Sequence, residues 1–325
     1  MPFAVLNPGG RDPEQHFPNG AGLPTDLGHA PVNYHAYAAC LSGGFYRDVK
    51  RLPSEPGAVL ILLRQRLGPA VDAVKVARAK GWKIWIALKE VGAHQIADFL
   101  DDPKRIAQFR QLCAESDGAL ASTPDAATLY SSFGARRVEL VPTPYPVEEP
   151  AWDFSTAAEP RDGIWIGTRE FNVASRNHAA ALAIAGQLGC RVSVMVNDAR
   201  TRRRVAALGN FEIVEGPLPY ADYLRHIARH RVVFQLDRSR VPGQVAGDAL
   251  LTRTPCVGGD GAIEQIAFPS TGGWGRTNGE LAELLRSVMK DSAFARSLAD
   301  SAEQTARAKL SFSAIREEFE RLLAE

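Results

Sequence analysis

Short apolar runs alternate with longer amphipathic segments along the whole chain. Continuous apolar runs of this kind are typical of strands that are buried on both faces of a parallel sheet. In the first half of the chain they predict strands at residues 3–6, 58–63, 83–88, 118–122 and 138–141. In the second half they predict strands at residues 164–166, 191–196, 211–214, 232–236 and 256–257. The intervening segments have the hydrophobic spacing of amphipathic helices.

The alternation of strand and helix occurs twice, so the expected fold class is α/β, with two doubly wound Rossmann-like domains. Residues 147–162 are acidic, contain prolines and show no periodicity, which indicates an interdomain linker. We therefore expect a first domain at residues 1–150 and a second at residues 151–310. A last amphipathic helix is expected within residues 311–325.

Composition and charge narrow the class of protein. The chain has 325 residues, of which 45% are hydrophobic and 23% are charged, so it is globular and not disordered. The net charge of +1 gives no broad electrostatic attraction to nucleic acid, and we expect no nucleic-acid partner. No run is long and apolar enough for a transmembrane segment, and the first residues lack the basic region and apolar core of a signal peptide.

The cysteines and acidic residues show no pattern of a disulfide framework or a metal site. The four cysteines lie in apolar surroundings without paired spacing, at Cys40, Cys113, Cys190 and Cys256. Reduced, buried thiols are the expected state, and they suit a cytoplasmic protein. No acidic pair of the Asp-x-Asp type stands out, so we expect no bound metal.

The residues after the predicted strand at 164–166 form a candidate anion site. Gly167 ends the strand, and a loop that contains Arg169 and Arg176 leads into a helix. Guanidinium groups and the first N–H groups of a helix all donate hydrogen bonds, which suits the oxygens of a phosphate. The alternative is that both arginines are solvated loop residues.

A second candidate anion site lies within residues 236–266. After the strand at 232–236, a loop with Pro242 and Gly243 leads into a short helix, which Thr254-Pro255 ends. A further short strand and a run of glycines then lead into another helix. Both helix starts present backbone N–H groups, where an anion can bind.

The stretch PGQVAGDALLTRTPCVGGDGAIEQ resembles a segment of the retaining, nucleotide-sugar-dependent glycosyltransferases of the GT-B fold, the family-four-like or group 1 enzymes. Their segment reads E-G-F-G-x-x-x-x-E-A-x-A-x-G-T-P-V-V-x-x-x-x-G-x-x-E. The matching positions are Asp248 on the second glutamate, Thr254-Pro255 on Thr-Pro, Gly261 on the later glycine and Glu264 on the last glutamate. Arg240 falls on the first glutamate, which is a departure from the family pattern.

The resemblance implies two Rossmann-like domains that face a cleft. The acceptor lies on the first domain, the nucleotide sugar on the second, and the last helix crosses back to the first domain. In the family the first acid is associated with the donor sugar and the second with the ribose, so Asp248 is expected to bind the ribose. Asp237 is the candidate to replace the missing first acid. The donor-binding residues implied in this way are Gly9, Gly10, Gly167, Arg169, Arg176, Gly243, Gln244, Asp248, Gly259 and Glu264.

Two places in the first domain carry candidate site residues at strand ends. Gly9 and Gly10 follow the first strand, where the resembling family has a glycine-rich loop, although a plain turn is an equal alternative. Lys89 and Glu90 follow the strand at 83–88, and charged residues at the carboxyl end of a buried parallel strand are site candidates. The alternative there is a salt bridge that caps the sheet. The catalytic candidates are Lys89, Glu90, Arg169 and Arg176.

Polar and aromatic residues near the start of the helix predicted at 31–41 are candidates for binding the acceptor. Helix starts that follow the first strand of a doubly wound sheet face the ligand crevice. The acceptor candidates are His29, Asn33, Tyr34, His35 and His94. A surface helix start is the alternative for the first four, and a structural histidine is the alternative for His94.

The function implied by the resemblance is hexosyl or related transfer, with retention and without a metal or other cofactor. The nucleotide sugar is the donor substrate, and the acceptor is a glycan, protein, lipid or small molecule. Arg240 in place of the first acid leaves open a non-catalytic or altered binding subunit of the same fold. A sugar-nucleotide epimerase shares the fold and is a third alternative. A Rossmann dehydrogenase is disfavoured because no G-x-G-x-x-G follows the first strand.

Overall fold

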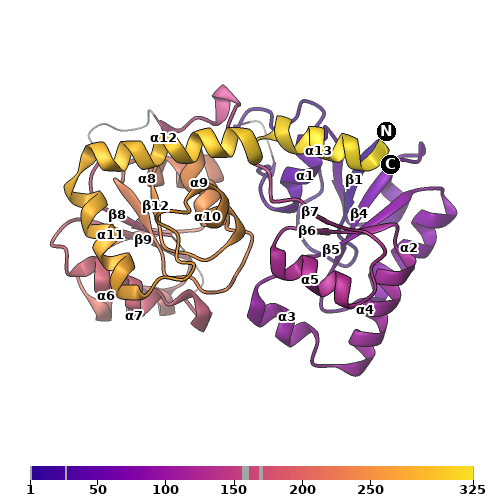
Figure 1. Ribbon diagram of the computed structural model, residues 1–325, viewed down its shortest axis with the longest axis horizontal. Helices are drawn as coiled ribbons and strands as arrows, with labels where there is room; N and C mark the ends of the chain where they lie inside the picture. Colours follow the sequence, from indigo (N-terminus) through magenta and orange to yellow (C-terminus); the bar gives the residue numbers. More distant parts are fainter. Residues whose placement is uncertain (1, 26–27, 156–160, 168–170, 325) are drawn as a thin grey trace. The chain divides into compact units, whose positions relative to one another are not determined.

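The computed structural model describes residues 2–25, 28–155, 161–167 and 171–324 of the chain (Figure 1). The chain divides into two compact units. Unit 1 comprises Met1–Pro146 and Leu310–Glu325, and unit 2 comprises Val147–Lys309. Each unit is an α/β fold with its own sheet and its own apolar core.

Unit 1 is built on a seven-stranded sheet with the strand order β2-β3-β1-β4-β5-β6-β7. The neighbouring strands are parallel, except for the antiparallel pair of β2 and β3. The strands are β1 (Phe3–Leu6), β2 (Gln15–His16), β3 (Gly44–Tyr46), β4 (Ala58–Leu63), β5 (Lys83–Leu88), β6 (Gly118–Ala121) and β7 (Val138–Leu140). The helices are α1 (Tyr34–Cys40), the 3-10 helix η1 (Val49–Arg51), α2 (Gly68–Ala79), α3 (Ala93–Phe99), α4 (Pro103–Glu115), α5 (Pro124–Ser132) and α13 (Phe312–Ala324).

The apolar runs of the sequence become the buried centre of this sheet. All six residues of β4 are buried, and β4 pairs with β1 on one side and β5 on the other. In Figure 1, α1 and α13 cover one face of the sheet, and α2, α4 and α5 cover the other. Since both faces are covered, each central strand must be apolar at every position, which explains why its sequence does not alternate.

The last helix is part of unit 1. The Phe319 ring of α13 meets the Phe3 ring of β1 edge to face, with 5.3 Å between the ring centroids. The Nε of Arg316 donates a 2.7 Å hydrogen bond to the carbonyl of Cys40, at the end of α1. The N–H of Tyr145 donates to the carbonyl of Leu310 at 2.7 Å, so the end of the chain returns to the segment that follows β7.

Unit 2 is built on a fully parallel sheet with the strand order β10-β9-β8-β11-β12. The strands are β8 (Ile164–Ile166), β9 (Val192–Val196), β10 (Glu212–Glu215), β11 (Val232–Phe234) and β12 (Cys256–Val257). The helices are η2 (Pro150–Trp152), η4 (Ala174–Arg176), α6 (His178–Gly186), α7 (Ala199–Leu208), α8 (Tyr220–Ala228), α9 (Gln244–Leu251), α10 (Ala262–Ala267), α11 (Asn278–Lys290) and α12 (Ser292–Lys309). In Figure 1, α6 and α7 cover one face of this sheet, and α8 and α9 the other.

The predicted strands and helices are confirmed apart from local differences. The first predicted helix begins at Tyr34 and not at residue 31. The strands β2 and β3 and the helix α3 were not predicted, because two or three residues carry no periodicity and α3 has only one fully buried residue, Phe99.

The first part of the predicted linker packs on unit 2 instead of joining two bodies freely. Trp152 is 2% exposed and Phe154 is 8% exposed, and the N–H of Phe154 donates a 2.9 Å hydrogen bond to the carbonyl of Leu251. Burying these two aromatic side chains is favourable, so the segment docks.

Each sheet has one point where the strand order reverses. In unit 1 the chain proceeds from β1 to its neighbour on one side, β3, and then resumes at β4 on the other side. In unit 2 the corresponding neighbours are β8 and β11. Loops that leave such a pair of strands diverge, and ligands of open α/β sheets bind in the crevice that this leaves at the carboxyl ends. The two reversal points are therefore where the site residues should be sought.

Two further findings concern the described part of the chain. None of its helices combines the length and apolarity needed to cross a bilayer. Its four cysteines are all free thiols, and three of them, Cys40, Cys113 and Cys256, are buried.

Candidate functional site

The loops after β8 and β11 meet at the reversal point of unit 2 and are joined by several hydrogen bonds. The Oγ atoms of Ser175 and Ser239 lie 2.6 Å apart, and the N–H of Arg238 donates to the carbonyl of Ser175 at 2.8 Å. The side chain of Asn177 donates to the carbonyl of Leu236 at 3.0 Å. Residues 175–177 and 236–239, far apart in the sequence, are thus joined at the carboxyl edge of the sheet, and we call them the rim.

Arg176 is held at this rim by a buried carboxylate. Its guanidinium Nη1 lies 3.0 Å from Oδ2 of Asp237, whose side chain is 5% exposed, while the Arg176 side chain is 17% exposed. The other carboxylate oxygen of Asp237 accepts from the N–H of Ser239 at 2.8 Å. A cation fixed in this way is pre-oriented for a second anion. Arg169, the other predicted phosphate ligand, lies outside the described residues.

Glycines bring the backbones of this rim close together. A Cβ on Gly167, directly after β8, would overlap the side chain of Val245 in α9. Gly243 precedes the first residue of α9, Gln244, with a φ of 98°, a left-handed conformation that favours glycine. The predicted arrangement of strand, glycine and helix start is therefore present after both β8 and β11.

Asp248 lies inside unit 2 and not on its surface. It is the fifth residue of α9, is 1% exposed, and accepts a 2.5 Å hydrogen bond from the hydroxyl of Tyr220. We expected this carboxylate to be presented to a ribose near the helix start. The structure instead turns it toward α8, because the residues of α9 from Ala246 to Leu251 are all buried.

Glu264 is also buried, and it packs against the glycine loops that were expected to bind the donor. It is 2% exposed, and its Oε1 accepts from Nε2 of Gln235 at 2.8 Å. A Cβ on Gly243 or Gly261 would overlap its carboxylate, and one on Gly259 would lie 2.8 Å from Oε1. These loops therefore approach one another around the Glu264 carboxyl group. In this structure Glu264 packs between the loops and is not exposed to a ligand.

We expect Glu264→Gln to stabilise the protein relative to the parent at high pH. Burial is the largest cause that raises the pKa of Glu264 from 4.5 to about 8. Between these two values the folded chain binds a proton that the unfolded chain has lost, so this residue's contribution to stability falls as the pH rises. Glutamine resembles the protonated acid and removes that dependence. Melting temperatures from pH 5 to pH 8.5 should show a difference that grows in favour of the variant, and a pH-independent difference would contradict the assignment.

Arg240 stands where the resembling family has its first acid, and its side chain is exposed. Its N–H donates to Oδ1 of Asp260 at 2.8 Å, and its guanidinium carbon lies 4.7 Å from the ring centroid of Trp274. Asp237 was the candidate to replace the missing acid. It is 3% exposed and engaged with Arg176, so the structure does not present it as a free carboxylate.

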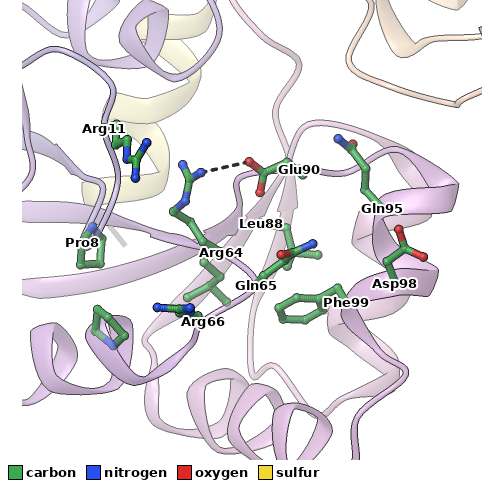
Figure 2. A pocket seen from close by; sticks show the side chains of 13 residues that line it. Pro8, Arg11, Arg64, Gln65, Arg66, Leu88, Glu90, Gln95, Asp98 and Phe99 are labelled. Carbon is green, nitrogen blue, oxygen red and sulfur yellow. Dashed lines mark ion pairs between the residues drawn. The ribbon is translucent and has the colours of Figure 1, made fainter. Parts of the chain in front are cut away.

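The reversal point of unit 1 holds a pocket of about 630 Å³. Its walls come from the loop after β1, the loop after β4, the end of β5 and the helix α3 (Figure 2). The lining residues are Pro8, Gly9, Arg11, Leu63, Arg64, Gln65, Arg66, Pro69, Leu88, Glu90, Gln95, Asp98 and Phe99. This volume lies within the range of small-molecule sites, and the place is where the fold class puts them.

The catalytic candidates of unit 1 lie at this pocket or beside it. Glu90 lines the pocket, and burial raises its pKa above the ordinary value. Lys89 turns to Asp12, with its Nζ 3.3 Å from Oδ2, and Asp12 also accepts from Nδ2 of Asn7 at 2.5 Å. Gly9 lines the pocket with a φ of 72°.

Gly10 does not line the pocket, but it allows the tight turn that lets the Asn7 side chain reach Asp12. A Cβ on Gly10 would overlap the side chain of Asn7, so only glycine leaves room for the Asn7 amide beneath the loop. The carboxyl ends of β1 and β5 are thereby joined by an ionic and hydrogen-bonded network of Asn7, Asp12 and Lys89.

Two of the residues predicted to bind the acceptor substrate are buried, although a helix start at the ligand crevice would expose them. Tyr34 and His35 are 5% and 3% exposed, because every residue of α1 is buried. The Tyr34 hydroxyl donates to the carbonyl of Leu88, and the His35 ring stacks on Phe45 with centroids 3.7 Å apart. Burial is the largest cause that lowers the pKa of His35 to about 3, so the ring is neutral. Both side chains therefore contact the sheet of unit 1, Tyr34 at the end of β5 and His35 at β3.

The remaining three candidates do not line the pocket either. The His29 ring lies against the ring of His35, with centroids 4.1 Å apart. Asn33 precedes α1 with a φ of 51°. His94 is the second residue of α3, whereas the residues of α3 that reach the pocket are Gln95, Asp98 and Phe99.

Three arginines of the pocket were missed in the sequence. Arg64 and Arg66 directly follow the run AVLILL, and Arg11 follows the glycines after β1. Their position after a fully apolar strand is the same signal that singled out Lys89 and Glu90. Among the residues that the structure describes, no group of three or more His, Cys, Asp and Glu could hold a metal ion.

Comparison with known proteins finds similarity in structure and not in sequence. No family model matches the chain, and no curated protein matches it. The crystal structure of Anabaena Alr3699/HepE in complex with UDP matches with a TM-score of 0.68 and 13% identity, covering 100% of both chains. An α,α-trehalose-phosphate synthase (UDP-forming) from Burkholderia xenovorans, in complex with glucose-6-phosphate, matches with a TM-score of 0.62 and 12% identity, covering 85% of this chain and 74% of its own.

A glycosyltransferase from Rickettsia africae matches with a TM-score of 0.62 and 11% identity, covering 82% of this chain and 76% of its own. At such identities the match concerns the arrangement of the backbone. It agrees with the two largely parallel sheets and the helices on both faces of each. The chain therefore has the GT-B fold, built of two doubly wound Rossmann-like units, that it shares with these solved structures.

Proposed function

We propose that the protein is a glycosyltransferase that uses a nucleoside diphosphate sugar as donor. The observation that carries this proposal is the rim at the reversal point of unit 2, where Arg176 is fixed by Asp237 next to two loops that end at helix starts. Such a rim supplies one oriented cation and backbone N–H donors, which are the groups that a diphosphate requires. The similar HepE structures, which contain UDP or UDP-glucose, support the same assignment.

The rate of glycosyl transfer depends on stabilising the diphosphate as it departs from the sugar. Negative charge grows on the phosphate oxygens in the transition state, and donors that are already oriented stabilise it without reorganisation. We assign this role to Arg176 together with the N-terminus of α9, and Arg169 is proposed as a second cation. Gly167, Gly243, Gln244 and Gly259 are proposed to let the donor approach the backbone.

Unit 1 is proposed to bind the acceptor in its pocket. Glu90 lies on the pocket wall, and Lys89 is held beside it by Asp12. We propose that these two residues of the β5 end position the acceptor hydroxyl group. Transfer is proposed to proceed with retention of configuration and without a metal ion, as the resemblance of the 236–266 stretch implies.

Turnover of nucleotide sugars tests the proposed function. The full chain is incubated with a panel of nucleoside diphosphate sugars, and release of the nucleoside diphosphate is followed with and without a chelator. Donor hydrolysis or transfer that resists the chelator supports a metal-independent transferase. Proton NMR of the product, read at the anomeric position before mutarotation, reports retention or inversion. No release with any donor would leave the transferase proposal without support.

A non-catalytic binding subunit of the same fold is the second candidate, favoured by Arg240. A guanidinium can only donate hydrogen bonds, so it cannot accept from sugar hydroxyl groups as a glutamate does. The Arg240 guanidinium instead packs over the Trp274 ring. Nucleoside diphosphate binding without any turnover would select this candidate over the enzyme.

We expect Asp248→Asn to weaken binding of a nucleoside diphosphate if Asp248 binds the ribose, as we propose. An amide accepts through one oxygen only, whereas a carboxylate accepts from both hydroxyl groups of a cis-diol. In the structure Oδ1 of Asp248 accepts from Tyr220, so a ribose would have to share or displace this hydroxyl.

Tyr220→Phe separates the two roles of Asp248. Removing the competing hydroxyl should leave nucleotide affinity unchanged or higher if Asp248 binds ribose, while Asp248→Asn lowers it. If Asp248 only anchors α8, both variants should lower the melting temperature and neither should change affinity in calorimetry. The second pattern would remove Asp248 from the donor site.

A further inference from the structure

The pocket of unit 1 has two chemically different ends. Figure 2 shows Arg11, Arg64 and Arg66 on one side and Gln95 and Asp98 of α3 on the other. The arginine side comes from the loops after β1 and β4, the two strands of the reversal point. A ligand that spans this pocket therefore meets guanidinium groups at one end and a carboxylate and an amide at the other.

Among the residues that the structure describes, two of the arginines have no protein partner for their charge. Arg11 and Arg66 are exposed, and within the described part of the chain neither side chain makes an ion pair or a hydrogen bond. Surface arginines are common, but two such groups in the lining of one concave site concentrate positive potential where a ligand would sit. The cost of desolvating them is offset only when an anion enters.

Arg64 is loosely held between two carboxylates. Its Nη1 lies 3.7 Å from Oδ2 of Asp12, and its Nη2 lies 3.6 Å from Oε1 of Glu90. Both separations exceed hydrogen-bond length, so the guanidinium is oriented without its donors being satisfied by these two groups. Asp12 is drawn more closely to Lys89 at 3.3 Å and to Asn7 at 2.5 Å.

The start of α2 adds to the positive end of the pocket. This helix has 12 residues from Gly68 to Ala79, and its second residue, Pro69, lines the pocket. The first N–H groups of a helix lack intrahelical acceptors and carry a partial positive charge. Pro69 itself has no N–H to donate, so this helix start contributes only through its dipole, which favours a negatively charged ligand.

We propose that the pocket of unit 1 binds an anionic acceptor, a sugar that carries a phosphate or carboxylate group. The anionic group lies at Arg11, Arg64 and Arg66, and the sugar hydroxyl groups lie toward Glu90, Gln95 and Asp98. This inference rests on the proposed glycosyl transfer and specifies the chemical class of its acceptor. The cavity of about 630 Å³ has room for a monosaccharide with its anionic substituent.

Direct binding to the full chain tests this proposal without any donor. Glucose 6-phosphate, glucuronate and unmodified glucose are titrated by calorimetry at low and at physiological salt. We expect at least one of the two anionic sugars to bind at least tenfold more tightly than glucose, because hydrogen bonds to charged groups are the stronger ones. The phosphate and carboxylate arms distinguish the source of the charge. Equal affinity for glucose and both anionic sugars, or no binding of any of the three, would overturn the proposal.

Arg11→Gln and Arg66→Gln locate the binding site. Each should lower the affinity for the preferred anionic sugar at least tenfold while the melting temperature stays within a degree or two of the parent, since neither side chain has an ion-pair or hydrogen-bond partner among the described residues. The matched control is Arg136→Gln, an exposed arginine of unit 1 just before β7, at the opposite edge of the sheet. Unchanged affinity in both pocket variants would place the anion elsewhere.

Binding of UDP, measured on the same preparations, separates this proposal from the proposed function. The pocket variants should bind UDP as the parent does, because the proposed donor site lies in unit 2. If UDP does not bind the parent chain but anionic sugars bind and depend on Arg66, the transferase proposal fails and the pocket assignment stands. If UDP binds and a UDP-sugar is turned over while anionic sugars do not bind, only the pocket assignment fails.

Discussion

Arg176→Ala is expected to lower the affinity for UDP by about ten- to a hundredfold and to reduce donor turnover at least as much. Hydrogen bonds between charged groups contribute about 1.5–3 kcal/mol, and 1.4 kcal/mol corresponds to a factor of ten in affinity. The Arg176 guanidinium is fixed before a ligand arrives, 3.0 Å from Asp237, so little ordering is needed on binding. Calorimetry with UDP and steady-state release of the nucleoside diphosphate measure both effects.

The same change removes the partner of a buried carboxylate and should destabilise unit 2. Breaking a buried ion pair by deleting one partner costs about 3–5 kcal/mol, and the Asp237 side chain is 5% exposed. The double variant Arg176→Gln, Asp237→Asn keeps a polar pair without charge and should recover most of the lost stability. Its affinity for UDP should stay low. Arg203→Ala, an exposed arginine of α7, is the matched control for charge.

The double variant decides between two roles for Arg176. If this residue only stabilises the rim, the double variant should bind UDP as tightly as the parent once its fold is restored. That result would remove Arg176 from the donor site and would weaken the transferase proposal with it.

Gly258→Ala is expected to destabilise unit 2 by about 3–5 kcal/mol, combining backbone strain with overpacking. Gly258 follows β12 with a φ of 85°, a conformation that costs other residues about 1–2 kcal/mol. A Cβ there would also overlap the carbonyl oxygen of Gln235, a backbone atom that cannot rotate away. Urea unfolding followed by fluorescence should show a lower midpoint.

Gly275→Ala separates the strain from the overlap. Its φ is 69°, and a Cβ there would meet nothing within 4 Å, so only the backbone term remains. We expect it to cost about 1–2 kcal/mol. Equal losses for the two variants would show that the overlap at Gly258 is relieved by movement of the chain. Because Gln235 lies two residues before Asp237, such movement should also weaken UDP binding in the Gly258 variant.

The sequence by itself determined the elements and their class. Runs such as AVLILL must be covered on both faces to be stable, so they predict parallel strands between layers of helices, as β4 shows. Gly167 and the two arginines after the strand at 164–166, and Gly243 after the strand at 232–236, predicted candidate anion sites at helix starts. The same local signals could have singled out Arg64 and Arg66, which directly follow β4.

Which side chains are buried and which are exposed was decided only by the tertiary structure. Asp248 and Tyr34 stand at helix positions that a sequence pattern cannot distinguish from exposed ones, yet packing of α9 on α8 and complete burial of α1 turn them inward. Likewise, the acidic residues around Trp152 predicted a linker, but burial of the Trp152 side chain packs this segment on unit 2. Periodicity reports which face of one element is apolar. The order of strands in a sheet, however, depends on contacts between segments that are far apart in the sequence. That order brings Arg11 to Arg64 in unit 1 and Arg176 to Asp237 in unit 2, and thereby creates both candidate sites.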